Sequence, residues 1–233
     1  QAWADEPKRA VICSISHAWE AREHPDPCGH QLLQVVNHTA LYVAAFLAEI
    51  WIFFDYVSLF QYLRESEAQQ ASFRKAMENM HVMYSHEMSI TFRIESLTPA
   101  ERWAKALHED EMITVFHAAS SVVKPVLIKD LVHNPTPYQN RGWCIGEMEW
   151  SSDRQATVQN QLIDIRRDSA GQQYRLELLG QVPTAPEHFA VKMETAAFTH
   201  RSDAAAVVHL QEKIFLEKVR RNAELSLEAL PRS

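Results

Sequence analysis

Short apolar runs alternate with helix-length amphipathic segments over the first hundred residues, and this alternation constrains the fold more than any other feature. Residues 11–16 form a β-branched apolar run that ends in small polar residues, which is typical of a buried strand leading into a loop. Residues 50–54 are continuously apolar and predict a central parallel strand covered on both faces. Residues 89–94 predict a third strand. This order predicts an α/β fold with a parallel sheet and right-handed crossovers.

Helices are predicted between these strands. From His30 to about Glu49, apolar residues recur every three or four positions and form a broad face for packing on a sheet. A second amphipathic pattern extends from Phe73 to Tyr84. A capping-box spacing with proline at the first helical position predicts a helix from Thr98 to about His108. Two further apolar runs, 112–116 and 122–127, are read as strands whose order stays open.

The second half of the chain is predicted to end in a long helix. Residues 138–150 are read as a loop that enters a helix, and residues 174–179 alternate like a strand. Pro183 and Pro186 predict a loop. Ser202 or Asp203 is expected to cap a long helix that continues to about Leu230.

These elements predict one α/β domain over residues 1–152, with an insertion at about 99–137. Residues 153–233 are predicted to form an extension that ends in the long helix and packs on the same domain. A chain of 233 residues, 46% of them hydrophobic, can bury a sizeable core without a disulfide or a metal.

Charge and composition exclude several classes of partner. The net charge of −7 offers no clustered basic surface for nucleic acid or for an anionic membrane. The sequence contains no run of 18 apolar residues, which a membrane span would need. Its first residues lack the layout of a signal peptide. The three cysteines have no paired spacing. We therefore expect the cytoplasm or another reducing intracellular compartment; a presequence removed upstream would leave no trace.

Polar residues that follow the predicted strands are the candidates for function, because open α/β sheets bind ligands beyond the carboxyl ends of their strands. Three sets qualify: Ser16, His17, Trp19 and Glu20; Asp55, Ser58 and Gln61; and Arg141 to Glu147. If Asp55 and Glu147 meet at one rim, they supply two carboxylates whose pKa values can be pushed apart for acid–base work on a sugar. The alternative is structural, because a carboxylate at a strand end often only caps the next helix.

Other reactive side chains are explained more simply by a structural role. Cys144 near Arg141 could be a nucleophile with a lowered pKa, but a cysteine between Trp143 and Ile145 is more typical of a core residue. Neither the Cys28–His30 pair nor the His81–His86 pair has a second ligand pair at zinc spacing, so no metal site is expected. The chain also lacks a glycine-rich phosphate loop.

Three segments resemble blocks of the heterokaryon-incompatibility (HET) domain, in the same order. Trp51 to Gln61, then Glu67 and Met80 to Tyr84, look like its middle block. Arg141 to Glu147 looks like its arginine–glycine–tryptophan block with the downstream glutamate, and Ser14 to Glu20 resembles its opening block.

The resemblance implies a fold and a reaction. HET domains are relatives of the TIR domain, a flavodoxin-like parallel sheet flanked by helices. In catalytic TIR domains, a glutamate four residues after a tryptophan cleaves the nicotinamide–ribose bond of NAD, and Glu147 stands four residues after Trp143. The resemblance therefore implies Glu147 as the catalytic carboxylate. It also implies these substrate-binding residues: Ser16, His17, Trp19, Asp55, Ser58 and Trp143.

The sequence departs from the family pattern beside the implied catalytic residue. Position 144 is cysteine, as in many plant TIR domains, where HET domains usually carry threonine. Met148, Glu149 and Trp150 replace the leucine and alanine–proline that usually follow the HET glutamate.

Two functions follow from these observations. The first is an NAD-cleaving hydrolase of a cell-death or signalling response, which requires no cofactor and takes NAD as a substrate. The second is a non-catalytic interaction module or accessory subunit that associates with itself or with protein partners. This second function is favoured by an apolar stripe along the last helix, formed by Val207, Leu210, Ile214, Val219 and Leu225.

Overall fold

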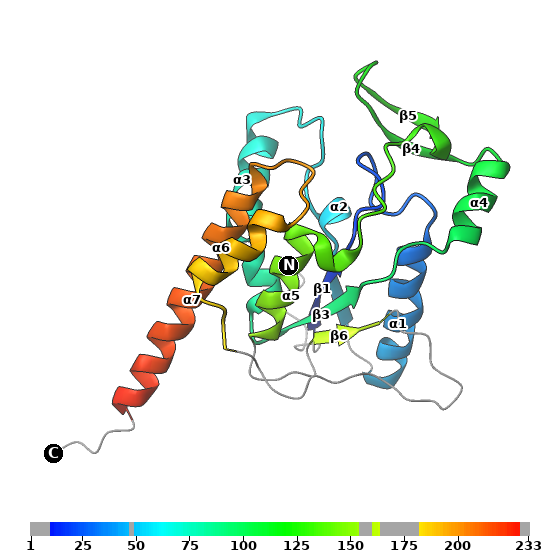
Figure 1. Ribbon diagram of the computed structural model, residues 1–233. Helices are drawn as coiled ribbons and strands as arrows, with labels where there is room; N and C mark the ends of the chain where they lie inside the picture. Colours follow the sequence, from blue (N-terminus) through cyan, green and yellow to red (C-terminus); the bar gives the residue numbers. More distant parts are fainter. Residues whose placement is uncertain (1–9, 47–48, 154–159, 164–181, 229–233) are drawn as a thin grey trace.

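The protein has a parallel sheet in which β1 and β3 occupy the centre (Figure 1). The structure, a computed structural model, describes residues 10–46, 49–153, 160–163 and 182–228. The strands of this sheet are β1 (Ala10–His17), β2 (Glu49–Phe53), β3 (Ser89–Ile94) and β6 (Asn160–Leu162). They are mutually parallel and lie in the order β2-β1-β3-β6. This order is compatible with a flavodoxin-like sheet.

Helices cover both faces of the sheet, and this confirms the predicted α/β class. The helices are α1 (His30–Phe46), α2 (Asp55–Ser58), α3 (Glu67–Ser85), α4 (Ala100–His108), α5 (Gly142–Ser152), α6 (Pro186–Thr195) and α7 (Asp203–Glu228). Helix α1 packs on one face, and α3 and α5 pack on the other (Figure 1). Short 3-10 turns, η1 (Ile128–Asp130) and η2 (Tyr138–Asn140), lie in the connections.

Alternation along the two central strands separates an apolar face from a polar one. Cys13 and Ile15 of β1 pack with Phe92 of β3 and Val35 of α1 in one buried cluster. Successive side chains of a strand point to opposite faces, so Ser14 and the residues in step with it face α3 and α5. Ser14 and Thr91 therefore meet on the α3–α5 side, whereas His17 at the end of β1 lies on the α1 side and contacts Gln31.

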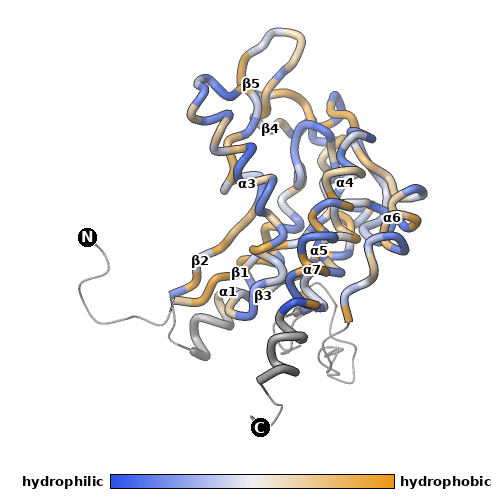
Figure 2. Tube along the Cα trace, turned by 90° about the vertical axis from the view of Figure 1, so that its left-hand side faces the viewer, coloured by the Kyte–Doolittle hydropathy of each residue, from blue (hydrophilic) through white to orange (hydrophobic). Residues whose placement is uncertain are grey.

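The expected central position of residues 50–54 is wrong. Strand β2 is the edge strand of the described sheet, and Trp51 and Ile52 are 50% and 40% exposed. Figure 2 shows hydrophobic colour along both β1 and β2, although only β1 has a strand on each side. A continuous apolar run favours a strand without specifying its place in the sheet.

Helices α6 and α7 share one apolar core with α3 and α5. Its buried members are Met80, Tyr84, Trp150, Phe189, Met193, Ala196, Val207, Leu210 and Ile214. The predicted loop is present at Pro183, but it ends before Pro186, because this proline begins α6, where its missing N–H costs nothing. The first half of the apolar stripe on α7 is therefore used inside the protein.

The two apolar runs at 112–116 and 122–127, whose strand order stayed open, form an antiparallel hairpin outside the parallel sheet. Strand β4 (Met112–His117) pairs with β5 (Val122–Leu127), and the hairpin extends past α2 in Figure 1. The predicted strand 174–179 and the predicted helix end at Leu230 lie outside the described residues. Among the helices that are described, none combines the length and apolarity needed to cross a membrane.

Candidate functional site

The candidate site lies where the chain changes direction across the sheet. From the central strand β1 the chain goes by α1 on one face to β2, and it returns by α3 on the other face to β3. Ser16 of β1 and Arg93 of β3 are neighbours in register at the carboxyl end of these strands. Ligands of open α/β sheets bind at such a switch point, outside the carboxyl ends of the strands.

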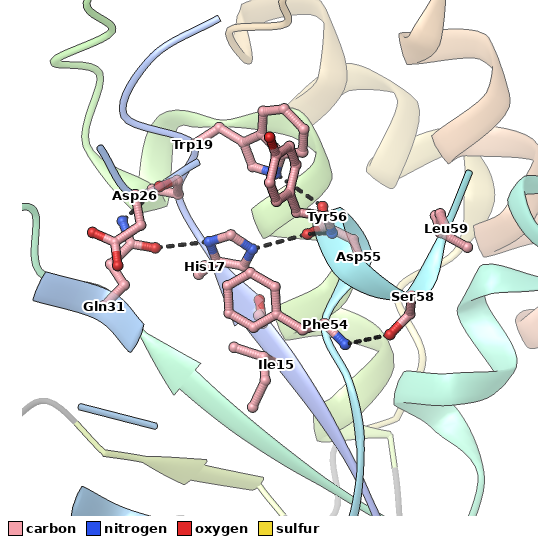
Figure 3. A network of polar contacts seen from close by, with 12 residues as sticks. Ile15, His17, Trp19, Asp26, Gln31, Phe54, Asp55, Tyr56, Ser58 and Leu59 are labelled. Atoms are coloured by element: carbon pink, nitrogen blue, oxygen red, sulfur yellow. Dashed lines mark hydrogen bonds and ion pairs between the residues drawn. The ribbon is translucent and has the colours of Figure 1, made fainter. Parts of the chain in front are cut away.

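His17, at the end of β1, bridges two acceptors (Figure 3). Its Nε2 lies 3.0 Å from Oδ1 of Asp55, and its Nδ1 lies 2.7 Å from Oε1 of Gln31. The orientation of the Gln31 amide is set by its Nε2, which donates to the Ala18 carbonyl at 2.8 Å and to Glu20 at 2.9 Å. Because both neighbours of the ring present oxygen acceptors, both ring nitrogens donate and the imidazole is protonated.

Asp55 and His17 hold each other in the charged state. Burial opposes the charge of His17, but the neighbouring carboxylate outweighs burial and raises the pKa of His17. Burial likewise acts to raise the pKa of Asp55, and His17 together with the N–H donors of Trp19 and Tyr56 lowers it overall. Trp19 Nε1 donates to Asp55 Oδ2 at 2.9 Å. Asp55 is the more accessible partner, with 21% of its side chain exposed.

Glu147 lies in a second network on the α5 side of the same strand end. Ser16 Oγ donates to Glu147 Oε2 at 2.6 Å. Because Ser16 has one hydroxyl hydrogen, the Tyr138 hydroxyl donates to Ser16 Oγ at 2.5 Å. Glu147 is 5% exposed, and burial raises its pKa to about 8, assisted by the charge of Asp55. Hydrogen bonds from Ser16 and Tyr84 and the charge of His17 act the other way.

The start of α5 holds Glu147 at this depth. A Cβ at Gly142 would lie 1.8 Å from the Phe198 ring, so only glycine allows α5 to begin against this side chain. Arg141 secures the segment before the helix, because its guanidinium donates to the backbone carbonyls of Trp19, Asn134 and Thr136. Every nitrogen of that guanidinium is used for positioning.

Glu20 joins the loops after β1 and β3. Its carboxylate is fully buried and accepts from the Thr98 backbone N–H at 3.0 Å, from the Thr98 hydroxyl at 2.8 Å and from Trp103 Nε1 at 3.1 Å. Gln31 is a further donor. Glu20 therefore connects the His17 network to α4, a role that its place in a loop did not reveal.

The structure brings together four of the predicted site residues with Glu147, namely Ser16, His17, Trp19 and Asp55. It does not bring the other two into these networks. Ser58 is exposed on α2, where its hydroxyl accepts from the Phe54 N–H at 3.0 Å. Trp143 packs toward α7, and its Nε1 donates to Asp203 Oδ2 at 3.2 Å.

Cys144 has the structural role rather than the nucleophilic one. Its thiol is buried and donates to the His17 carbonyl at 3.4 Å. Burial raises the pKa of this thiol well above its usual value, with Glu147 adding to the effect, so the reactive thiolate is disfavoured. Trp150 is fully buried in the core.

Sequence reasoning missed Tyr84, Tyr138, Gln31 and Arg93, which complete or flank the two networks. All four are buried polar residues, and nothing in their local sequence separates them from core or surface residues.

Within the described part of the chain, no three His, Cys, Asp or Glu side chains gather where they could hold one metal ion. Comparisons with family models, curated proteins and solved structures find no match to this chain.

Proposed function

We propose that the protein hydrolyses the N-glycosidic bond of a nucleotide, with NAD as the substrate and Glu147 as the catalytic carboxylate. The observation that carries this proposal is a pair of carboxylates at one strand end with opposite shifts: the pKa of Glu147 is raised and that of Asp55 is lowered. Groups whose pKa values are pushed apart in this way are typical of acid–base sites. The site also needs no cofactor for this reaction.

The proposed reaction breaks one bond and forms one. The bond between C1′ of the ribose and the pyridinium nitrogen breaks, and its electron pair leaves with neutral nicotinamide. Water adds to C1′ and releases a proton, so the products are nicotinamide, ADP-ribose and H⁺. The ionised form of Glu147 would stabilise the positive charge that develops on the sugar. The positive charge of the pyridinium ring of NAD favours that ionised form when the substrate binds.

Asp55 and Trp19 are proposed to line the nucleotide side of this site. The Trp19 ring meets the Tyr56 ring edge to face, with centroids 5.6 Å apart, beside the partly exposed Asp55. Aromatic faces of this kind stack on bases, and a carboxylate can accept from ribose hydroxyls. Ser16 and His17 are proposed to orient the two carboxylates, because each donates directly to one of them.

The test is release of nicotinamide from NAD by the purified chain, compared between two glutamine variants of the same helix. Glu147→Gln is expected to lower turnover by roughly 100-fold or more, the usual size of a lost acid–base group. Glu149→Gln is the matched control, because Glu149 faces Thr184 and Lys192 instead of the site. The wild-type rate is expected to rise toward about pH 8 as Glu147 ionises. Undiminished turnover by Glu147→Gln would end the proposal.

We further propose that the fold is flavodoxin-like and TIR-related, and that the reaction serves a cell-death or signalling response. The strand order β2-β1-β3 and the helices on both faces support this relationship. So does the resemblance of the segments around Ser16, Asp55 and Glu147 to the HET blocks. Detection of the same nicotinamide release in cells that express the chain, and its loss with Glu147→Gln, would test the biological part.

A second candidate is a non-catalytic module that assembles with further copies of itself. The observation that favours it is an exposed apolar segment that begins in α2 and continues toward α3. It is formed by Val57, Phe60, Tyr62 and Leu63, which are 48% to 76% exposed. Replacing all four with serine is expected to abolish concentration-dependent association in light scattering. A wild-type chain that stays monomeric at high concentration would exclude this candidate.

A further inference from the structure

Arg93 holds a buried positive charge that neither polar network uses. Only 8% of its side chain is exposed, and its buried Nε makes no hydrogen bond within the described residues. Glu95 Oε1 lies 3.6 Å from this nitrogen, beyond hydrogen-bond distance. Arg141 shows the contrast, because each of its guanidinium nitrogens donates to a backbone carbonyl. A role in positioning the backbone therefore explains Arg141 but not Arg93.

Arg93 faces the same side of the sheet as the Glu147 network. Its Cα is in register with that of Ser16 on the neighbouring strand, and Thr91, two residues earlier, lies 3.0 Å from the Ser14 hydroxyl on this face. The charge of Arg93 also acts on the Tyr138 hydroxyl, which donates to Ser16. Arg93 thus stands at the β1–β3 switch point, where open α/β sheets bind their ligands.

A guanidinium whose Nε is kept from water without a hydrogen-bond acceptor is costly, and an anion relieves that cost. The guanidinium presents N–H groups in a planar fork that matches the oxygens of a phosphate or a carboxylate. The Tyr138 hydroxyl is close enough for the charge of Arg93 to act on it, but its hydrogen is donated to Ser16. The site therefore offers one cation whose Nε has no hydrogen-bond acceptor among the described residues.

Glu95 and Gln139 cover this position from the solvent side. Gln139 Nε2 donates to Glu95 Oε2 at 2.8 Å, in a solvent-exposed hydrogen bond. The other oxygen of Glu95 is the one that approaches Arg93. An anion that enters must displace this loosely held carboxylate, so Glu95 acts as its competitor.

We propose that Arg93 binds a phosphate group of the substrate at the β1–β3 switch point and that Glu95 occupies its place when the site is empty. The assignment of this phosphate to a nucleotide rests on the proposed function, whereas the anion site itself does not. The charge of Arg93 would thus recognise the phosphates of the substrate.

Binding of inorganic pyrophosphate, measured by titration calorimetry, tests the anion site without any turnover. Wild-type protein is expected to bind pyrophosphate, and Arg93→Met is expected to bind it roughly 10- to 100-fold more weakly, the effect of a charge-assisted hydrogen bond. Arg93→Lys is expected to fall between them, because lysine keeps the charge and loses the fork. The control is Arg102→Met, since Arg102 is already paired with both oxygens of Glu111 at 2.7 Å.

Glu95→Gln provides a second measurement that keeps Arg93 intact. Removing the competing charge is expected to tighten pyrophosphate binding by at least about threefold. No binding by the wild type, equal binding by Arg93→Met, or no gain with Glu95→Gln would each overturn the anion site. A protein that binds pyrophosphate through Arg93 but does not cleave NAD would overturn the proposed function alone.

Discussion

At the scale of single residues, the two carboxylates show how burial and charge compete. Glu147 and Asp55 are both held in polar networks, yet burial prevails at Glu147 and the neighbouring imidazolium prevails at Asp55. The difference lies in the partners, because Ser16 is a neutral donor whereas His17 carries a charge. The same strand end therefore favours the protonated form of Glu147 and the ionised form of Asp55.

The raised pKa of Glu147 predicts how stability depends on pH. The folded protein keeps the proton on Glu147 up to about pH 8, whereas the unfolded chain loses it near its ordinary pKa of 4.5. The stability that this proton contributes is complete below the unfolded pKa and is lost as pH rises through the folded one. Glu147→Gln cannot ionise, so the melting temperature of the wild type is expected to fall relative to this variant between about pH 4.5 and pH 8, and the difference is expected to stay constant above about pH 8.

Thermal unfolding at a series of pH values from about 4 to 9 checks this prediction, with Glu109→Gln as the control. The exposed ion pair of Glu109 with Lys105 supplies the control in place of Glu149, whose side chain is only 11% exposed and whose charge helps to raise the pKa of Asp153 to about 8. Glu109→Gln should follow the wild type at every pH. A constant difference between Glu147→Gln and the wild type across the series would contradict the raised pKa.

The His17–Asp55 pair predicts a clear cost for losing the carboxylate. Asp55→Asn leaves the His17 ring buried beside a neutral amide, and we expect a loss of about 1–3 kcal/mol in the free energy of unfolding. Urea unfolding measures this loss. The same substitution at Asp110, whose ion pair with Lys129 is solvent-exposed, should cost less than about 1 kcal/mol. Equal effects at both positions would argue against a buried charged pair.

At the scale of elements, Glu20 links the loops that follow the two central strands. Glu20→Gln places an amide NH₂ opposite the N–H donors of Thr98 or Trp103, so at least one buried donor loses its acceptor. We expect a loss of about 2 kcal/mol in stability and faster hydrogen exchange of the Thr98 amide. Glu23→Gln is the control, because Glu23 accepts an exposed backbone N–H from Val132. Unchanged exchange at Thr98 would contradict this role.

At the scale of the whole molecule, α7 is part of the core that α3 and α5 build. Ile214 is buried among them, whereas Val219, five residues on, is 49% exposed. Ile214→Ala is therefore expected to cost about 2–4 kcal/mol in the free energy of unfolding, and Val219→Ala less than about 1 kcal/mol. Chemical denaturation of both variants measures the difference. Similar costs at the two positions would mean that α7 does not pack as described.

Local pattern was sufficient to predict the α/β class and the strands that bear the site. The strands at 11–16, 50–54 and 89–94 are all present, because apolar runs and turn residues depend only on near neighbours in the chain. Polar residues at their ends could be named for the same reason. Ser16, His17, Trp19 and Asp55 do lie together at the carboxyl edge.

Contacts between distant segments decided the rest. Ser16 contacts Glu147, which is 131 residues away in the chain. Strand β2 lies at the edge of the described sheet because β3 pairs with β1 and not with β2. In the sequence, Arg93 looks like an ordinary strand residue near a glutamate, and nothing there shows that its buried Nε lacks a hydrogen bond. Burial, register and missing partners arise only when the sheet and its helices assemble, so only the tertiary structure reveals them.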